Sequence, residues 1–154
     1  MNESSYEKKS IRDVTFYNVN WSGYLNCEKF NILKKLTDMT GIYVVFEVNE
    51  YKRLSPILLG GAWFTGLRTT TLKLFNPTSV DPIPKELLRK ISTGKTYLKY
   101  LEIYILDDYQ NIFSKLKEIY QSAHFDTNGI DIPERVDNVK LNDKNTKTYH
   151  KKKN

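Results

Sequence analysis

The amino-acid sequence predicts an α+β (α/β) fold in which a small three-stranded sheet, mixed or antiparallel, is flanked by helices. Residues 41–48 and 56–60 are two apolar runs joined by a polar connection, a pattern that favours an antiparallel pair of strands. Residues 98–106 alternate apolar with more polar side chains, and this period of two indicates a half-buried third strand. The spacing of apolar residues before and after these runs is instead helical.

Four helices are predicted, at residues 27–39, 67–75, 85–91 and 108–124. The first has an apolar stripe opposite a basic face and ends before Gly41, and the last repeats apolar residues at helical spacing. Pro84 suits the first turn of the third helix, where a backbone N–H has no intrahelical partner. Residues 14–19 are rich in β-branched and aromatic side chains and predict an edge strand or an extended arm.

Length and charge predict one folded domain between two flexible ends. A chain of 154 residues buries about 68–70% of its unfolded surface and needs no second domain. We expect a flexible N-terminus at residues 1–12, a single domain at 13–136 and a disordered basic tail at 137–154. Most of the net charge of +6 lies in that tail, on Lys140, Lys144, Lys147, Lys151, Lys152 and Lys153.

Composition narrows the class of protein further. No run approaches the roughly 18 apolar residues of a membrane span, and the polar N-terminus lacks a secretory signal, so we expect an intracellular, cytoplasmic protein that is not in a membrane. The single Cys27 excludes an internal disulfide framework, and two histidines exclude a three-histidine metal site. The basic tail predicts attachment to the phosphate backbone of DNA, with solubility or chance composition as an equal alternative.

A set of spaced residues within the predicted hairpin and helices suggests a family. The first strand opens with Gly41-Ile42-Tyr43, the second ends in Leu58-Leu59-Gly60, and Arg68 follows eight residues after Gly60. Glu118 lies in the last predicted helix, with Asn128 ten residues beyond it. This order resembles the GIY-YIG nuclease family, whose first motif is literal here and whose second has lost its tyrosine. The resemblance spans residues 40–128 and implies a GIY-YIG-like fold.

The resemblance implies a metal-dependent endonuclease that hydrolyses DNA phosphodiester bonds. Tyr43 would orient or deprotonate the attacking water, Arg68 would clamp the phosphate, and Glu118 would hold one Mg²⁺ or Mn²⁺ ion. These roles suit the chemistry, because a cation and an arginine fork both neutralise charge on the phosphate. The implied substrate-binding residues are Gly60, Lys73 and Asn128.

Each of these residues also has a structural interpretation. Tyr43 can be a packed aromatic, Arg68 a surface residue, Glu118 part of a solvated helix face, and Asn128 before Gly129 a turn signal. Because leucine replaces the second tyrosine, the alternative is a catalytically inactive module of the same fold that binds nucleic acid or protein. A small interaction protein with a chance triplet is a third possibility. The DNA target, whether a specific site or branched, damaged or foreign DNA, stays open.

Overall fold

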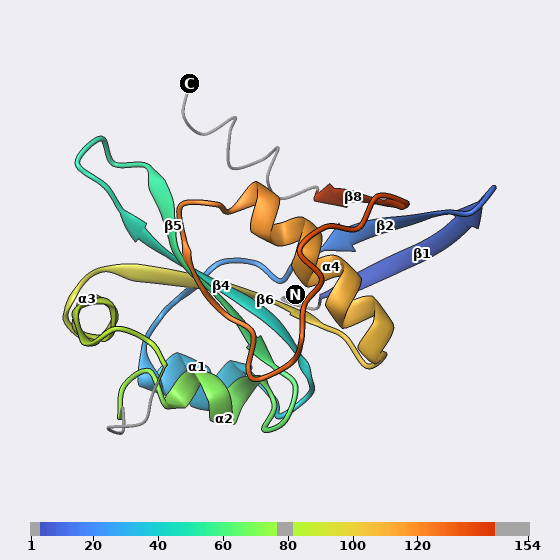
Figure 1. Cartoon of the computed structure of the whole chain (residues 1–154). Helices are drawn as coiled ribbons and strands as arrows, with labels where there is room; N and C mark the ends of the chain where they lie inside the picture. The colour runs from blue at the N-terminus through green and yellow to red at the C-terminus, as the bar shows by residue number, and fades with distance from the viewer. Residues whose placement is uncertain (1–3, 77–81, 144–154) are drawn as a thin grey trace.

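The computed structural model describes residues 4–76 and 82–143, which form an α+β fold of four helices with one three-stranded and one five-stranded mixed sheet. Figure 1 shows the five-stranded sheet between α1, α2 and α3 on one side and α4 on the other. The elements in chain order are β1 (Ser5–Ile11), β2 (Val14–Asn20), β3 (Leu25–Asn26), α1 (Lys29–Lys35), β4 (Gly41–Val48), β5 (Leu54–Ala62), α2 (Leu67–Leu72), α3 (Lys85–Thr93), β6 (Thr96–Glu102), α4 (Leu106–Ile119), β7 (His124–Asp126) and β8 (Val139–Asp143).

The five-stranded sheet has the order β3-β6-β4-β5-β7. Its centre confirms the three predicted strands, because β4 pairs antiparallel with both β5 and β6. The predicted total of three strands is wrong, since β3 joins one edge and the short β7 runs parallel to β5 at the other. The third strand also ends four residues early. Ile103 stays buried, but Ile105 is exposed and is the residue with extended backbone that immediately precedes α4.

The two faces of this sheet build two separate hydrophobic cores. Alternate residues of β4 point to opposite sides, so Ile42, Val44 and Phe46 enter one core while Tyr43 and Val45 enter the other. The first core is closed by α4 and the three-stranded sheet. The second is closed by α1, α2 and α3. All four predicted helices exist with shifted ends, and none of the helices in the described segments is long and apolar enough to cross a membrane.

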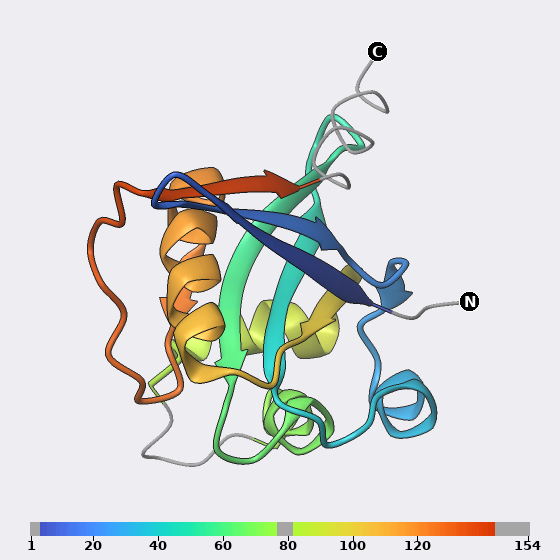
Figure 2. The same ribbon diagram turned by 90° about the vertical axis from the view of Figure 1, so that its right-hand side faces the viewer.

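The three-stranded sheet has the order β1-β2-β8 and crosses over the larger sheet (Figure 2). Arg12 and Asp13 join β1 to β2 with positive φ angles of 48° and 67°, as a tight two-residue hairpin turn requires. The predicted edge strand at 14–19 is therefore a central strand, with β1 on one side and β8 on the other.

The two predicted flexible ends are wrong where the structure describes them. Residues 5–11 and 139–143 are strands of the smaller sheet, because each supplies backbone hydrogen bonds and apolar side chains that β2 needs as partners. The sequence-based expectation failed because these segments are polar on their exposed face. The rest of the predicted tail, residues 144–154, lies outside the described part of the chain.

A buried carboxylate ties the β1–β2 hairpin to α4. Asp108, in the first turn of α4, is 1% exposed and accepts hydrogen bonds of 2.7 Å from the hydroxyls of both Tyr6 and Tyr17. The Lys8 ammonium lies 3.0 Å from the same carboxylate. Burial raises the pKa of Asp108, but these donors outweigh it and hold the pKa below its usual value.

A buried lysine ties β6 to β8. Lys99 is 1% exposed, and its ammonium lies 4.5 Å from the centre of the Trp21 ring and 5.3 Å from that of Tyr120. The Asp143 carboxylate accepts hydrogen bonds from the Trp21 indole, at 2.8 Å, and from the Tyr120 hydroxyl, at 3.1 Å. Burial lowers the pKa of Lys99 to about 8, and the nearby charge of Asp143 opposes this shift. The last residue of β8 therefore completes the polar centre of the core.

Candidate nucleic-acid interface

The three predicted catalytic residues do not converge. Tyr43 is fully buried in the core beneath α1, α2 and α3, and Arg68 belongs to α2 on that same side. Glu118 belongs to α4, which packs on the opposite face of the sheet (Figure 1). The expectation that their side chains share one concave surface is wrong, because α2 and α4 cover opposite faces of the five-stranded sheet.

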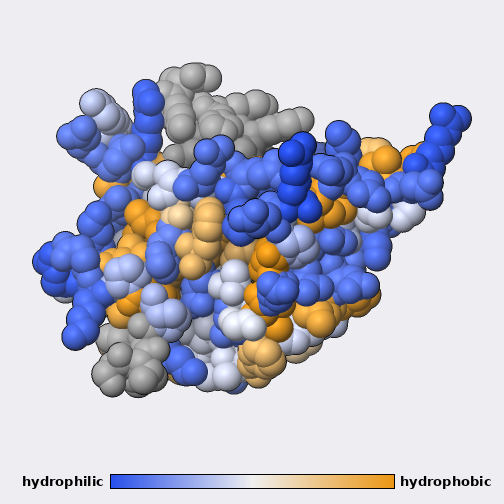
Figure 3. All heavy atoms as spheres, in the orientation of Figure 1, coloured by the Kyte–Doolittle hydropathy of each residue, from blue (hydrophilic) through white to orange (hydrophobic). Residues whose placement is uncertain are grey.

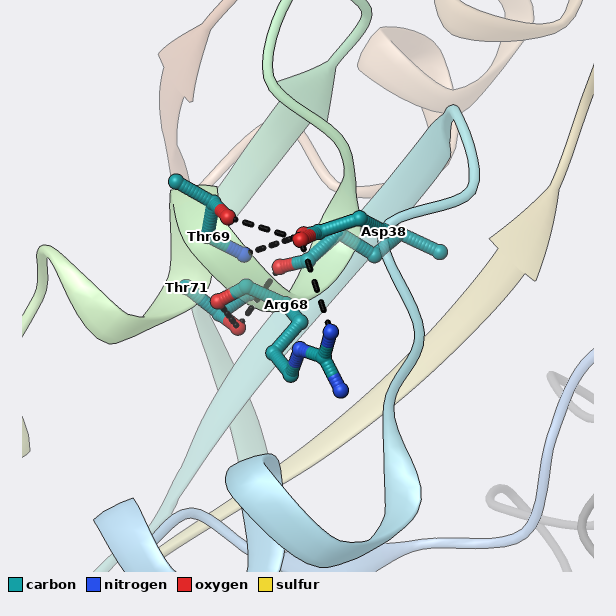
Figure 4. A network of polar contacts seen from close by, with 5 residues as sticks. Asp38, Arg68, Thr69 and Thr71 are labelled. Atoms are coloured by element: carbon teal, nitrogen blue, oxygen red, sulfur yellow. Dashed lines mark hydrogen bonds and ion pairs between the residues drawn. The ribbon is translucent and has the colours of Figure 1, made fainter.

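Arg68 takes part in a helix cap instead. Figure 4 shows Asp38 reaching α2 from the loop after α1, where its carboxylate accepts hydrogen bonds from the Thr69 backbone N–H (2.7 Å) and the Thr69 hydroxyl (3.0 Å). The Arg68 guanidinium lies 3.6 Å from the same carboxylate. The Thr69 backbone bond contributes most to lowering the pKa of Asp38, and Arg68 adds to it. Asp38 therefore supplies the cap that Gly66, lacking a side chain, does not.

Glu118 lies on an exposed part of α4, with its carboxylate 3.4 Å from the Lys115 ammonium one turn earlier. This matches the solvated helix face that was the alternative interpretation of Glu118. Among residues 4–76 and 82–143, no group of three or more histidine, cysteine or acidic side chains is placed to hold a metal ion. The Mg²⁺ or Mn²⁺ ion stays a prediction.

The predicted substrate-binding residues do come together around Tyr43. Gly60 is the antiparallel partner of Tyr43, and a Cβ on Gly60 would lie 2.3 Å from the Tyr43 ring, so only glycine leaves room for it. Tyr43, Lys73 and Asn128 line one cavity of about 440 Å³. Asn128 has a positive φ of 58° and accepts hydrogen bonds from two backbone N–H groups, as its turn interpretation expects.

A second feature, which sequence reasoning missed, is the outer face of the three-stranded sheet. Tyr17 and Val19 of β2 point into the core, so the alternate residue Phe16 points outward and is 36% exposed. Phe16 is paired with Lys9 on β1 and with Lys140 on β8, and both lysines are exposed. Residues paired across strands stand side by side on the same face. An aromatic ring is thus flanked by two ammonium groups in the middle of an open sheet.

The next row of this face carries amides. Asn18 is paired with Glu7 on one side and with Asn142 on the other, and the Asn142 amide donates a hydrogen bond of 3.1 Å to the Asn18 amide oxygen. The two rows border a shallow hollow of about 340 Å³. We call this surface, made by Lys9, Phe16, Asn18, Lys140 and Asn142, the sheet platform.

Further basic residues are close in sequence to the strands of the sheet platform. Arg12 occupies the turn of the β1–β2 hairpin, which projects from the body of the molecule (Figures 1 and 3). Five lysines follow β8 in the sequence, within the eleven residues after Asp143. The alternation of side chains along residues 14–20 could have indicated two faces of a strand. The sequence does not show which of these faces packs against the core, because that depends on the tertiary structure.

Comparisons with known proteins correct the family expected from the sequence. A family model described as "Uncharacterised protein" matches residues 5–154, and no GIY-YIG family is detected, so the resemblance based on Gly41-Ile42-Tyr43 is wrong. A three-residue motif recurs by chance, and here packing explains it, because Ile42 is buried in the first core and Tyr43 in the second. No curated protein and no solved structure matches the chain.

Proposed function

The chain belongs to this family of uncharacterised proteins, and from its geometry we propose that it binds single-stranded nucleic acid on the sheet platform. The observation that carries the proposal is the row Lys9–Phe16–Lys140, an exposed ring between two exposed lysines on the outer face of the three-stranded sheet. Proteins that bind single strands combine aromatic side chains, on which bases stack, with a basic surface that follows the phosphates.

The dimensions of the row suit this ligand. Neighbouring strands lie about 4.8 Å apart, so Lys9 and Lys140 are separated by two such steps, about 10 Å, with Phe16 between them. A base stacked on Phe16 would place the phosphates on either side of it within reach of the two long lysine side chains. The amides of Asn18 and Asn142 would offer hydrogen bonds to base edges, which a duplex keeps paired.

The function that the sequence resemblance implied, hydrolysis of phosphodiesters by Tyr43, Arg68 and Glu118, has less support. The Tyr43 side chain is 0% exposed, and Arg68 and Glu118 lie on opposite sides of the sheet, each beside an oppositely charged partner. In the described part of the chain, Lys9, Phe16 and Lys140 of the sheet platform are by contrast exposed on one face. Binding rather than cleavage is therefore the activity that we propose.

The first test replaces Phe16 by alanine. Loss of one stacked base costs about 1–3 kcal/mol, so we expect the affinity for a fluorescent twelve-nucleotide single strand to fall roughly 5- to 150-fold. Fluorescence anisotropy with oligo(dT) and oligo(rU) measures this and shows whether DNA or RNA binds better. Phe30→Ala is the matched control, since Phe30 is an exposed phenylalanine on α1, and it should leave the affinity unchanged.

Two results would contradict the proposal. One is an affinity that Phe16→Ala and Phe30→Ala lower equally, because the ring at position 16 would then have no special role. The other is tighter binding of duplex than of single strands of the same sequence, since paired bases cannot stack on the ring. Thermal unfolding of both variants checks that their folds are retained.

A second prediction concerns the five lysines after Asp143. Replacing Lys144, Lys147, Lys151, Lys152 and Lys153 by glutamine in the full chain should flatten the dependence of affinity on salt. The log–log slope should fall by about 0.7 for each lysine that neutralises a phosphate of a single strand, up to about 3.5 in all. Anisotropy titrations at several salt concentrations measure the slope. Phe16→Ala should weaken binding without changing the salt slope. An unchanged slope in the glutamine variant would show that these lysines do not contact the phosphates.

A further inference from the structure

The cavity of about 440 Å³ beside Tyr43 is lined by apolar, hydroxyl-bearing and charged residues. It lies where α2 and the segment after β7 meet the end of β5, on the far side of the large sheet from the core that supports the sheet platform. Figure 1 shows the segment after β7 running down past β5 towards α2. Small-molecule sites in proteins have volumes of about 300–1,000 Å³, so the cavity is large enough for one such ligand.

One part of the lining is aromatic and apolar. Phe64, in the loop between β5 and α2, is 68% exposed although it borders the cavity. Its ring stands against Gly129, where an added Cβ would lie 3.6 Å from the ring. Ile83 and Leu74 are buried residues of the lining. An exposed ring at the mouth and apolar walls behind it provide a surface on which a flat ring system can stack.

The other part is polar and carries both signs of charge. The lining includes a basic residue, Lys73, just after α2, and an acidic residue, Asp126, the last residue of β7. Thr65 and Thr70 also line the cavity, and their hydroxyls lie 2.6 Å apart. A lysine with hydroxyl donors suits a phosphate, while a carboxylate suits the hydroxyl or amino groups of a sugar or base.

Hydrogen bonds fix these groups relative to one another. The Asn128 side-chain oxygen accepts from the backbone N–H groups of Trp63, at 2.8 Å, and of Phe64, at 3.0 Å. The Asn128 backbone N–H in turn donates to the Asp126 carboxylate at 3.0 Å. One asparagine therefore fixes the main chain at Phe64 and holds the Asp126 carboxylate near it, so this part of the site is organised before any ligand enters.

We propose that this cavity binds a nucleoside monophosphate, with its base on Phe64, its phosphate at Lys73 and the threonine hydroxyls, and its sugar or amino groups at Asp126. Only a ligand with both a flat ring and an anionic group uses both halves of the lining. The site does not depend on nucleic-acid binding at the sheet platform, with which it shares no residue.

Isothermal titration calorimetry on the full chain tests this with AMP, GMP, CMP and UMP. Adenosine and inorganic phosphate are the probes that each lack one half of the ligand, and both should bind at least tenfold more weakly than the best monophosphate. Lys73→Ala should weaken monophosphate binding about tenfold or more and leave adenosine unaffected, because it removes only the phosphate partner. Lys35→Ala is the matched control, an exposed lysine at the end of α1 that does not line the cavity.

Phe64→Ala should weaken monophosphates and adenosine alike, since both would lose the stacking surface. Phe16→Ala, on the sheet platform, should leave monophosphate binding unchanged, so that failure of one proposal is distinguishable from failure of the other. The inference is overturned if no monophosphate binds at millimolar concentration, if phosphate alone binds as tightly as AMP, or if Lys73→Ala behaves like Lys35→Ala. Thermal unfolding confirms that each variant is folded.

Discussion

Replacing Asp108 by alanine is expected to destabilise the protein by about 2–4 kcal/mol. The buried Tyr17 hydroxyl loses its acceptor, which costs about 1–3 kcal/mol, and the partly buried Tyr6 hydroxyl loses the same carboxylate at a smaller cost. Lys8 loses its ion pair as well, which adds less because Lys8 is exposed. Urea denaturation at pH 7 measures the loss. Asp107→Ala, an exposed aspartate in the same turn, should change the stability by less than about 0.5 kcal/mol.

The same variant has a signature at acid pH. The pKa of Asp108 is lower in the folded protein than in the unfolded chain, where it is near 3.9. Its stabilising contribution is therefore complete above that unfolded value and disappears as the pH falls through the folded one. The stability difference between wild type and Asp108→Ala should shrink between pH 5 and pH 2. A difference that stays constant over this range would mean that the carboxylate is not the source of the stabilisation.

Replacing Asp143 by asparagine is expected to cost about 3 kcal/mol at pH 7, the lower end of the range for breaking a buried pair. Asparagine keeps an oxygen that can accept from the Trp21 indole, so the main change is that the buried Lys99 ammonium loses its counter-charge. Lys99→Met should also destabilise the protein, because it leaves the buried Asp143 carboxylate without its counter-charge. The double variant removes both charges and should cost less than the sum of the two single variants. Chemical denaturation of the two single variants and the double variant measures the coupling.

Alkaline pH separates charge from packing at this centre. The pKa of Lys99 is about 8 when folded and near 10.4 when unfolded, so the folded state releases its proton first and stability rises with pH from about 8. Burial raises the pKa of the Cys27 thiol to about 12, which opposes this rise from about pH 8 upward, because the thiol of the unfolded chain, with a pKa near 8.5, ionises first. The stability of wild type relative to Lys99→Met, which also contains Cys27, should therefore rise by about 1 kcal/mol between pH 8 and 9.

Asp131→Asn is the control for Asp143→Asn, since Asp131 is an exposed aspartate. It should leave both the stability at pH 7 and its rise between pH 8 and 9 unchanged. Asp143→Asn is introduced both into wild type and into Lys99→Met. If the loss of stability is the same in both backgrounds, it comes from lost hydrogen bonds rather than from the uncompensated lysine. The assignment of Asp143 as the counter-charge of Lys99 would then be wrong.

The candidate sites differ in how far the sequence predicted them. The substrate-binding residues Lys73 and Asn128 do border a cavity with Tyr43, but the resemblance that selected them is wrong. The catalytic set failed because sequence spacing along β4, α2 and α4 contains no information on which face of the sheet each helix covers. The sheet platform went unnoticed because Phe16 in a run of β-formers is indistinguishable from a core residue until its strand is placed.

The sequence by itself determined the local structure: the central antiparallel strands β4, β5 and β6, all four helices and the burial of alternate strand residues. These follow from apolar periodicity, which acts over a few residues. Only the tertiary structure decided that polar ends of the chain become β1 and β8, that Asp108 and Asp143 are buried, and that Glu118 and Arg68 are held apart. The physical reason is that a strand or a buried charge is stabilised by partners distant in sequence, here 91 residues away for Asp108 and Tyr17 and 122 for Trp21 and Asp143.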